Sequence, residues 1–545
     1  MNKHLSVLSR STRLLLATLI VLAALLTGTT PARAASLSVT TLEDELNADG
    51  DCSLREAIQA ANTDTAVDAC PAGAGADTIT FSLNGTITLG SFLPTIVTTM
   101  TIDGGQNIIL SGNHAVPVLF VFGSGNLEVQ RLTITAGSTA LPGGAIHNDG
   151  TLTITNSTFS GNSASNDGGA INSRGTATVS NSTFSGNTTR GGGGAIHNDG
   201  TLTVTNSTFS GNSATHSGGG INSRGTATVT NSTFSGNSAT NSGGGINNEG
   251  TTIVSNSTFA GNTASIGGAI SNYPFDRAML TVIHSTLSGN SAATSGGGIY
   301  IGVNPFELEA GTLHLISTII ANSPSGGDCV NDGILGTYSD NLIEDGGSTC
   351  GFALTADPNL GLLQDNGGPT QTMALETGSP AIDGAENSMI CANAPVNNLD
   401  QRGMPRPIDG NHDGLALCDI GAFEVQVQFT YPFSGFFSPV DNLPVLNTIK
   451  AGQAIPVRFS LGGDQGLDIF AVGYPKVQQI ACDGSAPGDA IEETVTSGIS
   501  GLQYDPATDT YTYVWKTQKS WAGTCRQLIV RLGDGTDHVA NFQFK

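Results

Sequence analysis

The chain has 545 residues, among them 73 glycines and eight cysteines, and carries a formal net charge of −24. So acidic a surface repels nucleic acid and anionic lipid, which excludes functions that depend on binding either of them. Only 12% of the residues are charged, so the chain is not a disordered acidic tail, and glycine at nearly twice its usual share of about 7% predicts an architecture with many tight turns.

Residues 1–34 have the pattern of a secretory signal peptide. Basic residues such as Lys3 and Arg13 precede an apolar run over 14–26, and small residues at 32–34 fit a cleavage site. The run is shorter than the about 20 apolar residues that cross a bilayer, and no later stretch is long and apolar enough to do so. We therefore expect a secreted or cell-surface protein without a transmembrane segment in the mature chain.

A short amphipathic helix is predicted directly after Cys52. Ser53 and Glu56 have the spacing of a capping box, in which each side chain bonds to the backbone NH of the other residue. An apolar stripe follows on one helical face, formed by Leu54, Ala57, Ile58 and Ala61. We expect residues 35–76 to form an N-terminal cap, with this helix over the first coil of the fold that follows.

A 25-residue repeat dominates residues 77–320. Most units read Gly-Gly-Ala/Gly-Ile, a loop, Thr-x-Thr-Ile/Val-x-Asn-Ser-Thr-Phe and then Ser/Ala-Gly-Asn. Apolar Leu152 and Ile154 alternate with polar Thr151 and Thr153, a period of two that indicates short β-strands. Short strands in a fixed frame, separated by glycine and asparagine turns, predict a right-handed parallel β-helix in an all-β protein, with one coil per unit.

Residues at one position of successive coils are expected to stack. The phenylalanines would form a continuous core, and the asparagines a hydrogen-bonded ladder of side-chain amides at one turn. The two sets are Phe159, Phe184, Phe209, Phe234 and Phe259, and Asn162, Asn187, Asn212, Asn237 and Asn262. Asn-Ser-Thr triplets also recur and match a glycosylation sequon, but their place in a packed strand-turn favours a structural role.

One loop position alternates in charge along the repeat. It holds Asp149, Arg174, Asp199, Arg224 and Glu249. Stacked acids and bases predict a weak salt-bridge ladder. The alternative is a row of catalytic carboxylates, but Asp149 and Asp199 would lie about 10 Å apart with an arginine between them, wider than the about 6.5–9.5 Å of an inverting glycosidase pair.

Residues 321–427 are expected to hold the terminal coils and a terminal cap. Asp409, Asn411 and Asp413, followed by a glycine, have the spacing of the first half of a calcium loop. The acidic ligand expected at the twelfth position is replaced by Ile420. Calcium binding and a plain acidic turn both remain open, and no other cofactor is expected.

A β-sandwich of the immunoglobulin type is predicted for residues 428–545. The segments 455–461 and 511–515 alternate as half-buried strands. Trp515 belongs to this alternation and is expected in the core, whereas Trp521 could also serve as a platform for carbohydrate.

The eight cysteines fall into neighbouring pairs, and an even number in an exported chain favours disulfides. The sequence does not fix their connectivity, and neighbour pairing is the simplest expectation. It joins Cys52 to Cys70, Cys329 to Cys350, Cys391 to Cys418 and Cys482 to Cys525. The last pair would join the two sheets of the sandwich.

Several motifs resemble those of known families. Residues 52–58 resemble the signature of CSLREA-domain exported bacterial proteins, and the Gly-Gly-Ala-Ile and Phe-Ser-Gly-Asn units resemble the repeats of chlamydial polymorphic outer-membrane proteins. Residues 357–424 resemble the choice-of-anchor Q region. Residues 428–545 resemble a PxKF domain, although Arg458 stands where that motif has lysine. The resemblance implies a β-helical surface adhesin of the bacterial cell envelope, and none of these motifs defines a reaction.

The sequence thus predicts a non-catalytic, adhesin-like interaction protein, a β-helical rod that presents a sandwich and binds a polysaccharide or another cell-surface ligand. A polysaccharide lyase or glycoside hydrolase of the β-helix class is one alternative. It would need clustered acids with arginine or lysine in a long groove, whereas the coils are mostly serine, threonine, asparagine and glycine outside. A surface that binds ice or another flat lattice is a second alternative, suggested by outward threonine pairs such as Thr151/Thr153 and Thr176/Thr178.

Overall fold

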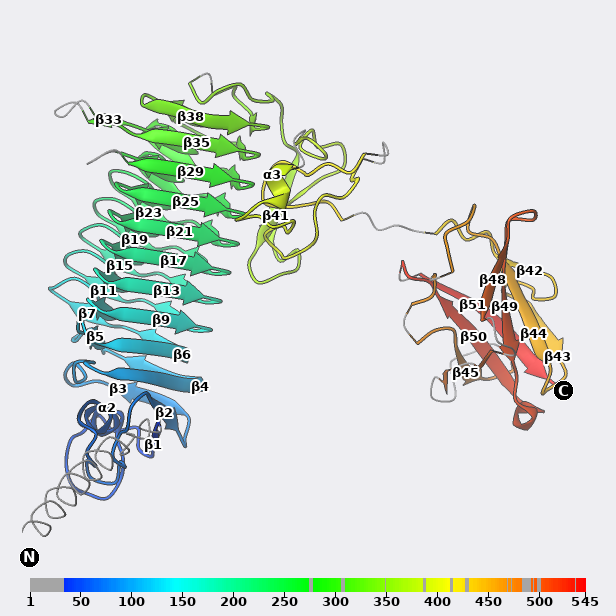
Figure 1. The fold of residues 1–545 in the computed structure, drawn as a ribbon, viewed down its shortest axis with the longest axis horizontal. Coiled ribbons are helices and arrows are strands. Elements are labelled where there is room, and N and C mark those ends of the chain that lie inside the picture. Colours follow the sequence, from blue (N-terminus) through cyan, green and yellow to red (C-terminus); the bar gives the residue numbers. More distant parts are fainter. Residues whose placement is uncertain are drawn as a thin grey trace, which may run out of the picture. The chain divides into compact units, whose positions relative to one another are not determined.

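The computed structural model describes most of the chain after the predicted signal peptide. The described residues are 34–273, 278–304, 309–347, 349–385, 389–411, 415–426, 431–467, 469–471, 473–482, 492–493, 495–496, 501–534 and 536–545. The chain divides into two compact units, one up to Gln426 and the other from Val427, each with its own hydrophobic core (Figure 1). Among the described residues, no helix combines the length and apolar character needed to cross a membrane.

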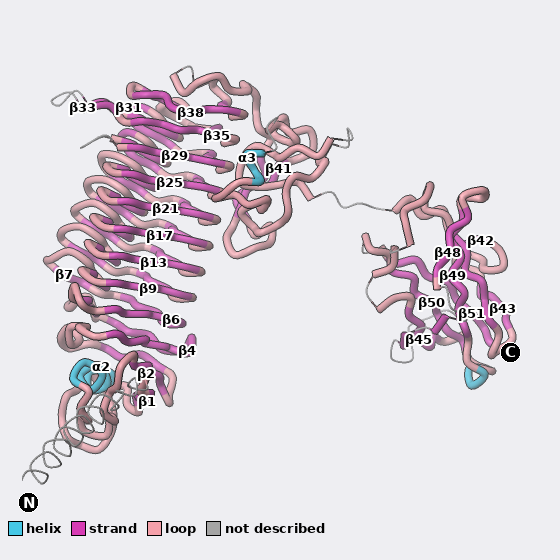
Figure 2. The backbone as a smooth tube through the Cα atoms, viewed as in Figure 1, coloured by secondary structure: helices cyan, strands magenta, loops and turns pink. Residues whose placement is uncertain are grey.

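The first unit is a right-handed parallel β-helix, as the repeat predicts (Figure 2). Its coils stack on one another, and their strands form three long sheets. The described strands of the 21-stranded sheet are β1 (Ser36–Val39), β2 (Asp77–Phe81), β3 (Gly85–Thr88), β4 (Thr99–Ser111), β6 (Asn126–Thr135), β9 (Thr151–Thr155), β10 (Thr158–Ser160), β13 (Thr176–Ser180), β14 (Thr183–Ser185), β17 (Thr201–Thr205), β18 (Thr208–Ser210), β21 (Thr226–Thr230), β22 (Thr233–Ser235), β25 (Thr251–Ser255), β26 (Thr258–Ala260), β29 (Met279–Ile283), β30 (Thr286–Ser288), β35 (Thr312–Ile316), β36 (Ile319–Ala321), β38 (Ile334–Ser339) and β39 (Leu342–Ile343).

Two shorter strand stacks complete the coils. The nine-stranded sheet consists of β5 (Leu119–Val121), β8 (Ile146–Asn148), β12 (Ile171–Ser173), β16 (Ile196–Asn198), β20 (Ile221–Ser223), β24 (Ile246–Asn248), β28 (Ile270–Asn272), β32 (Ile299–Ile301) and β37 (Cys329–Asn331). The seven-stranded sheet consists of β7 (Ser138–Thr139), β11 (Ser163–Ala164), β15 (Thr188–Thr189), β19 (Ser213–Ala214), β23 (Ser238–Ala239), β27 (Thr263–Ile266) and β31 (Ser291–Ser295). A small hairpin of β33 (Val303–Asn304) and β34 (Glu309–Ala310) projects from one coil.

Equivalent residues of successive coils stack in register. Phe159 pairs with Phe184, and Phe184 with Phe209, in parallel strands. Along the row of five phenylalanines, the ring centroids are 4.6–4.9 Å apart and the rings are tilted by at most 7°. The aromatic stack therefore runs along the solenoid and forms part of its buried core.

The asparagine row forms a ladder of buried amides. Asn162 Nδ2 donates to Asn187 Oδ1 at 3.0 Å, and the same bond recurs in each later coil as far as Asn290. Each Nδ2 also donates to a backbone carbonyl of the preceding coil, as Asn187 Nδ2 does to Phe159 at 3.0 Å. These bonds satisfy polar groups that would otherwise be buried without partners.

A second asparagine row explains the recurring Asn-Ser-Thr triplets. It consists of Asn156, Asn181, Asn206, Asn231 and Asn256, whose φ angles lie between 45° and 52°. Each residue makes the left-handed bend between two strands of the 21-stranded sheet, a conformation that asparagine adopts more readily than most side chains. His284 and Ser317 take the same place in later coils, with φ of 42° and 45°.

The N-terminal end is closed by α2 (Leu54–Thr63), which has the predicted capping box. Ser53 Oγ accepts from the Glu56 backbone NH at 3.2 Å, and Glu56 Oε2 accepts from the Ser53 backbone NH at 2.9 Å. Arg55 forms a bidentate pair with Asp44 and donates to the carbonyl of Phe92 at 2.8 Å. The helix is thereby bound to the first coils. The Cys52–Cys70 disulfide holds its N-terminal side.

The Cys329–Cys350 disulfide lies at the opposite end, where the Ile343 NH donates to the Leu354 carbonyl at 3.0 Å. The described residues of 357–426, which we call the flank lobe, then lie beside the coils rather than over their end (Figure 1). The lobe contains β40 (Leu360–Gln364), β41 (Thr372–Leu375), α3 (Met389–Ala392) and the Cys391–Cys418 disulfide.

The flank lobe contacts the left-handed bends and the strands that follow them. Gln401 Nε2 donates to Thr233 Oγ1 at 3.0 Å, and Gln401 Oε1 accepts from Thr258 Oγ1 at 2.6 Å. Further along the solenoid, the Gly421 NH donates to the Ser317 carbonyl at 2.8 Å. The expectation of a terminal cap is therefore wrong for this segment, because its polar contacts follow the side of four successive coils.

The second unit is a β-sandwich, in which two described five-stranded sheets share one core. One sheet contains β42 (Phe436–Phe437), β44 (Ala454–Phe459), β47 (Val495–Thr496), β48 (Leu502–Asp505) and β49 (Thr510–Lys516). The other contains β43 (Leu446–Ile449), β45 (Lys476–Ile480), β46 (Glu492–Glu493), β50 (Cys525–Arg531) and β51 (Asp537–Phe544). A short 3-10 helix, η1, spans Lys519–Trp521.

Two expectations for the sandwich need correction. Cys482 is bonded to Cys525, but Cys482 follows β45, which pairs with β50, so the disulfide lies within one sheet rather than between two. Trp521 is 4% exposed and Trp515 fully buried, and Trp515 packs against Phe542 with ring centroids 5.1 Å apart. The core position predicted for Trp515 is therefore confirmed, whereas Trp521 is not available as a carbohydrate platform.

Candidate binding surface on the solenoid

A shallow groove of about 360 Å³ follows the seven-stranded sheet, and we call it the hydroxyl groove. It is lined by Ser138, Thr139, Ser163, Ala164, Ser165, Thr188, Thr189, Arg190, Ser213 and Thr215. Four of these, Ser138, Ser163, Thr188 and Ser213, occupy one position of four successive coils in parallel register. Hydroxyl groups therefore recur at the coil spacing of about 4.8 Å, and each can both donate and accept hydrogen bonds.

A hollow of about 610 Å³ continues from the hydroxyl groove, and we call it the Arg190 hollow. It is lined by Ser165, Asn166, Asp167, Arg190, Gly191, Thr215, His216 and Arg224. Most of these residues lie in the loops between the seven-stranded and nine-stranded sheets of three successive coils. The hollow combines guanidinium, imidazole, amide and carboxylate groups, all of which can bind polar ligands.

An apolar hollow of about 550 Å³ lies beside the first coils and shares Thr139 with the hydroxyl groove. Phe92 and Leu141, which line it, are 58% and 69% exposed. Phe120 also lines it, with its ring centroid 5.1 Å from that of His147. A ligand that extends beyond the groove would meet apolar surface here.

His197 is buried, with its Nδ1 3.9 Å from Oδ1 of Asp167, which lines the Arg190 hollow, and hydrogen bonds hold it in one orientation. Asn222 Oδ1 accepts from Asn247 Nδ2 at 2.7 Å, so Asn222 Nδ2 faces His197 and donates to its Nδ1 at 3.1 Å. The imidazole proton is therefore on Nε2, which donates to Asp199 Oδ1 at 3.1 Å. This bond lowers the pKa of Asp199 and keeps the carboxyl ionised.

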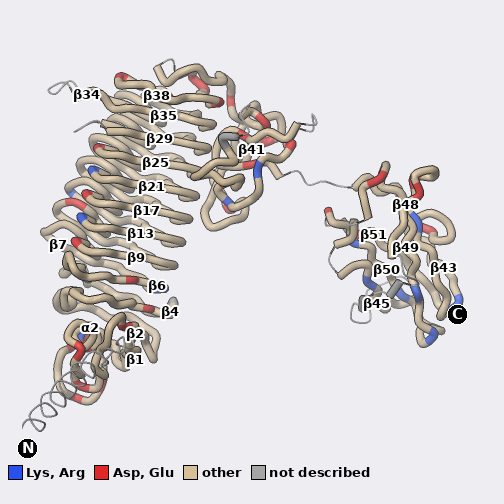
Figure 3. The backbone as a smooth tube through the Cα atoms, viewed as in Figure 1, with Lys and Arg blue, Asp and Glu red and all other residues tan. Residues whose placement is uncertain are grey.

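The alternating charge row is present in the structure but is not continuous. Arg174 Nη1 is 3.9 Å from Asp149 Oδ1, Arg224 Nη1 is 4.0 Å from Asp199 Oδ1, and Arg224 Nε is 3.0 Å from Glu249 Oε2. Among the described residues the row therefore forms two ion-paired groups rather than one ladder. Charged residues are otherwise sparse along the regular coils of residues 141–273 (Figure 3).

A separate cluster of buried charges lies where the flank lobe meets the solenoid. Arg402 Nη2 is 2.6 Å from Asp400 Oδ2, and Arg406 Nε is 3.6 Å from Glu424 Oε2. The Asp419 NH donates to Glu424 Oε2 at 2.9 Å. Burial raises the pKa of Asp419 to about 7 and that of Glu424 to about 8. The cluster is buried where the lobe contacts the solenoid, so we interpret it as a structural lock.

His284 completes this lock from the side of the solenoid. Its Nδ1 lies 2.6 Å from Arg406 Nη1. Burial, together with the charge of Arg406, lowers the pKa of His284 well below its usual value. The imidazole is therefore neutral, and its Nδ1 accepts a hydrogen bond from the Arg406 guanidinium. One coil of the repeat is thus adapted to dock the lobe.

The predicted calcium loop is only partly described. Asp409 and Asn411 lie within the described residues, whereas Asp413 lies outside them. The Asn411 and Leu417 NH groups donate to the Asp383 carboxylate at 2.8 and 3.2 Å. Burial raises the pKa of Asp383, and the charge of Asp409 adds to this effect. Calcium binding at Asp409, Asn411 and Asp413 stays a prediction.

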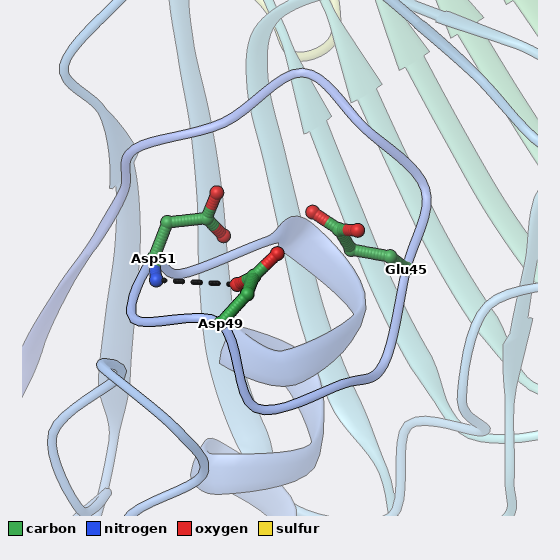
Figure 4. Close-up of side chains that lie close together, drawn as sticks. All are labelled: Glu45, Asp49 and Asp51. Carbon is green, nitrogen blue, oxygen red and sulfur yellow. Dashed lines mark hydrogen bonds between the residues drawn. The ribbon is translucent and has the colours of Figure 1, made fainter.

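One acidic cluster was not recognised in the sequence. Among the described residues, Glu45, Asp49 and Asp51 are the one group of three His, Cys, Asp or Glu whose ligand atoms lie within 4.8 Å of one another (Figure 4). Partial burial, together with neighbouring carboxylates, raises the pKa of Glu45 and Asp51. The Asp51 NH donates to Asp49 Oδ1 at 3.4 Å. The geometry describes an acidic loop beside the cap, and we assign no ligand to it.

Arg190, which lines both the hydroxyl groove and the Arg190 hollow, was likewise not recognised in the sequence. A signal for it was present. The equivalent positions of the neighbouring coils hold Ser165 and Thr215, so Arg190 departs from the repeat, as do the two glycines that follow it. Departures from a strict repeat are expected where a surface has a specific role.

The comparisons with known proteins concern the solenoid. Residues 115–277 match the right handed beta helix region family, and residues 284–302 match the Chlamydia polymorphic membrane protein repeat. No curated protein and no solved structure matches the chain. The resemblances of residues 52–58, 357–424 and 428–545 lie outside these matches and stay predictions. The matched repeat and the four disulfides suggest an extracellular or cell-surface protein, and the solenoid is similar to the surface-exposed, adhesin-like proteins that carry such repeats.

Proposed function

We propose that this chain is a non-catalytic interaction protein of the cell surface or the extracellular space, whose solenoid binds a polysaccharide along the hydroxyl groove. The observation that carries the proposal is the in-register row of hydroxyls on the seven-stranded sheet. A polysaccharide presents hydroxyls at the spacing of its own repeat, so a row of donors and acceptors at the coil spacing suits it. The charged and apolar hollows at either side extend the surface available to a chain-like ligand.

The groove hydroxyls retain hydrogen-bonding capacity for a ligand. Ser163 Oγ donates to Ser138 Oγ at 3.2 Å, which leaves lone pairs on both oxygens. Thr188, between Ser163 and Ser213 in the row, is exposed and makes no side-chain hydrogen bond to a described residue. A ligand hydroxyl that bonds there replaces water and leaves no buried protein group unpaired.

The electrostatics of the surface support binding without turnover. A glycosidase needs a carboxylic acid whose pKa is raised so that it can protonate the leaving group. Asp199 has the opposite shift, because His197 donates to it. In the described part of the chain, the carboxyls whose pKa is raised lie at other places, as in the N-terminal cap and the flank lobe. We therefore assign the charge row a structural role, the stabilisation of the coils, and no catalytic one.

The test compares two exposed threonines of the same coil. Thr188 lies in the hydroxyl groove, and Thr178 lies on the 21-stranded sheet. The oxidised chain and the variants Thr188→Tyr and Thr178→Tyr are applied to a glycan array, and the glycans that bind are assayed for release of reducing ends. We expect Thr188→Tyr to weaken binding at least about tenfold, because the ring fills the groove, while Thr178→Tyr binds like the wild type and no reducing ends appear.

Either of two results would contradict the proposal. Release of reducing ends would assign the chain to the lyases or hydrolases. A loss of binding in Thr178→Tyr instead of Thr188→Tyr would place the ligand on the outward threonine rows of the 21-stranded sheet, the surface that a flat lattice would use.

A further inference from the structure

Most charged residues of the regular coils, residues 141–273, belong to the charge row. Residues 141–273 contain only seven Asp, Glu, Lys or Arg residues. Five form the two ion-paired groups of the charge row. Of the other two, Asp167 accepts from the Gly192 NH at 2.7 Å, and its Oδ1 is 3.9 Å from His197 Nδ1. Arg190 makes no ion pair with a described residue, although the chain carries a net charge of −24.

Arg190 lies where two concave surfaces meet. It lines the hydroxyl groove together with Thr188, and it lines the Arg190 hollow together with Arg224. The Arg190 NH donates to the Ala164 carbonyl at 3.3 Å, so its backbone is fixed by the parallel register of the coils. The exposed guanidinium therefore projects from a rigid strand end at the edge of a groove built from hydroxyls.

The space beside Arg190 depends on two glycines. A Cβ on Gly191 would lie 2.4 Å from Asp167 Oδ1, and a Cβ on Gly192 would lie 2.8 Å from Asn222 Nδ2. Neither position has room for a side chain without displacing a polar partner. Because the two residues after Arg190 are glycines, no side chain fills the hollow beside the guanidinium.

The charges that line the hollow favour an anion. Arg190 and Arg224 are cationic, and Asp167 is the one carboxylate among the lining residues. Arg224 is already paired with Glu249 at 3.0 Å, whereas the Arg190 guanidinium makes no hydrogen bond or ion pair to a described residue. A guanidinium binds a carboxylate or a sulfate through two parallel hydrogen bonds, and the pairing is stronger in a recess than on an open surface.

Building on the proposed function, we infer that the Arg190 hollow binds the anionic group of an acidic polysaccharide, a carboxylate or a sulfate ester, while the hydroxyl groove holds the neighbouring sugar hydroxyls. The ligand class is therefore an acidic rather than a neutral glycan. Arg190 confers this selectivity, because it is the cation of the regular coils that no described carboxylate neutralises.

The test measures the affinity of the oxidised full chain for three oligosaccharides of equal length: an oligogalacturonate, a sulfated oligosaccharide and a neutral one. Arg190→Gln removes the charge, and Arg190→Lys keeps it. We expect the wild type to bind one of the acidic probes at least about tenfold more tightly than the neutral probe, with the preference weakened by salt. Arg190→Gln should abolish the preference, and Arg190→Lys should restore part of it.

The acidic probe that binds more tightly identifies the anion as carboxylate or sulfate. Equal affinities for all three probes, unchanged in Arg190→Gln but lost in Thr188→Tyr, would overturn this inference and leave the proposed function standing. Binding of none of the probes and of no glycan on the array would overturn both. The thermal unfolding profile of each variant, measured beside the affinity, separates a local effect from a loss of folding.

Discussion

Individual residues of the solenoid have roles that repeat from coil to coil, because each position is surrounded by copies of itself. Asn212 shows this most clearly. It donates to Asn237 Oδ1 at 2.9 Å and to the Phe184 carbonyl at 3.0 Å, and its own Oδ1 accepts from the NH and the side chain of Asn187. The side-chain amide of Asn212 thus forms hydrogen bonds with four buried polar groups of other residues. Asn181 lies instead at the exposed bend, where its role is to adopt the left-handed backbone conformation, with a φ of 50°.

We predict that Asn212→Ala lowers the free energy of unfolding of the solenoid by about 3 kcal/mol, because it leaves buried donors and acceptors without partners. Asn181→Gly should change it by less than about 0.5 kcal/mol, since glycine adopts the left-handed conformation freely. Urea unfolding followed by circular dichroism measures both. Equal effects of the two substitutions would show that the amide ladder does not stabilise the coils.

Contacts between equivalent residues of neighbouring coils could be predicted from the sequence. A strict 25-residue frame is enough to place Phe159 beside Phe184 and Asn162 beside Asn187, because stacking follows from the period alone. It could not show that Arg174 and Asp199 belong to different ion-paired groups, since side-chain direction is decided by local packing.

At the scale of elements, predictability depends on the sequence separation of the contacts. The α2 capping box joins residues three apart and was predicted from the sequence. The flank lobe was not, because Gln401 meets Thr233 across 168 residues of chain. The position of the Cys482–Cys525 disulfide within one sheet likewise depends on the pairing of β45 with β50, which the spacing of two cysteines cannot reveal.

The buried charges of the flank lobe predict that its stability falls between pH 6.5 and pH 8.5. Burial raises the pKa of Asp419 and Glu424 above their unfolded values, so the folded lobe holds a proton that the unfolded chain has released. This contribution is full at low pH and is lost as the pH rises through about 7 to 8. Below about pH 6.5 the lowered pKa of His284 acts in the opposite direction, because the unfolded imidazole then gains a proton.

Hydrogen exchange measured by mass spectrometry tests this prediction, once the exchange rates are corrected for the intrinsic effect of pH. Peptides from the flank lobe should lose about 1–2 kcal/mol of protection between pH 6.5 and pH 8.5. Peptides from β16 to β18 serve as the internal reference and should lose none. Unchanged or greater protection of the lobe at pH 8.5 would show that burial does not raise the pKa of the two carboxyls as far as this.

The whole solenoid presents the same few polar groups again and again, and a ligand with its own repeat can match such a surface along several coils. Two features interrupt the regularity. The flank lobe covers one side over the later coils, and the Arg190-Gly191-Gly192 segment opens a hollow on another. The regular background could be predicted from the sequence, whereas these interruptions, which carry the specific contacts, required the structure.

Polysaccharide binding along the hydroxyl groove is tested most directly by a map of the contacts that the bound polysaccharide makes. A photoreactive derivative of the oligosaccharide that binds most tightly is crosslinked to the oxidised chain, and the modified peptides are identified by mass spectrometry. We expect crosslinks within residues 163–167, 188–191 and 213–216, which contribute the lining of the hydroxyl groove and the Arg190 hollow. Crosslinks confined to the outward face of the 21-stranded sheet or to the sandwich of residues 431–545 would contradict it.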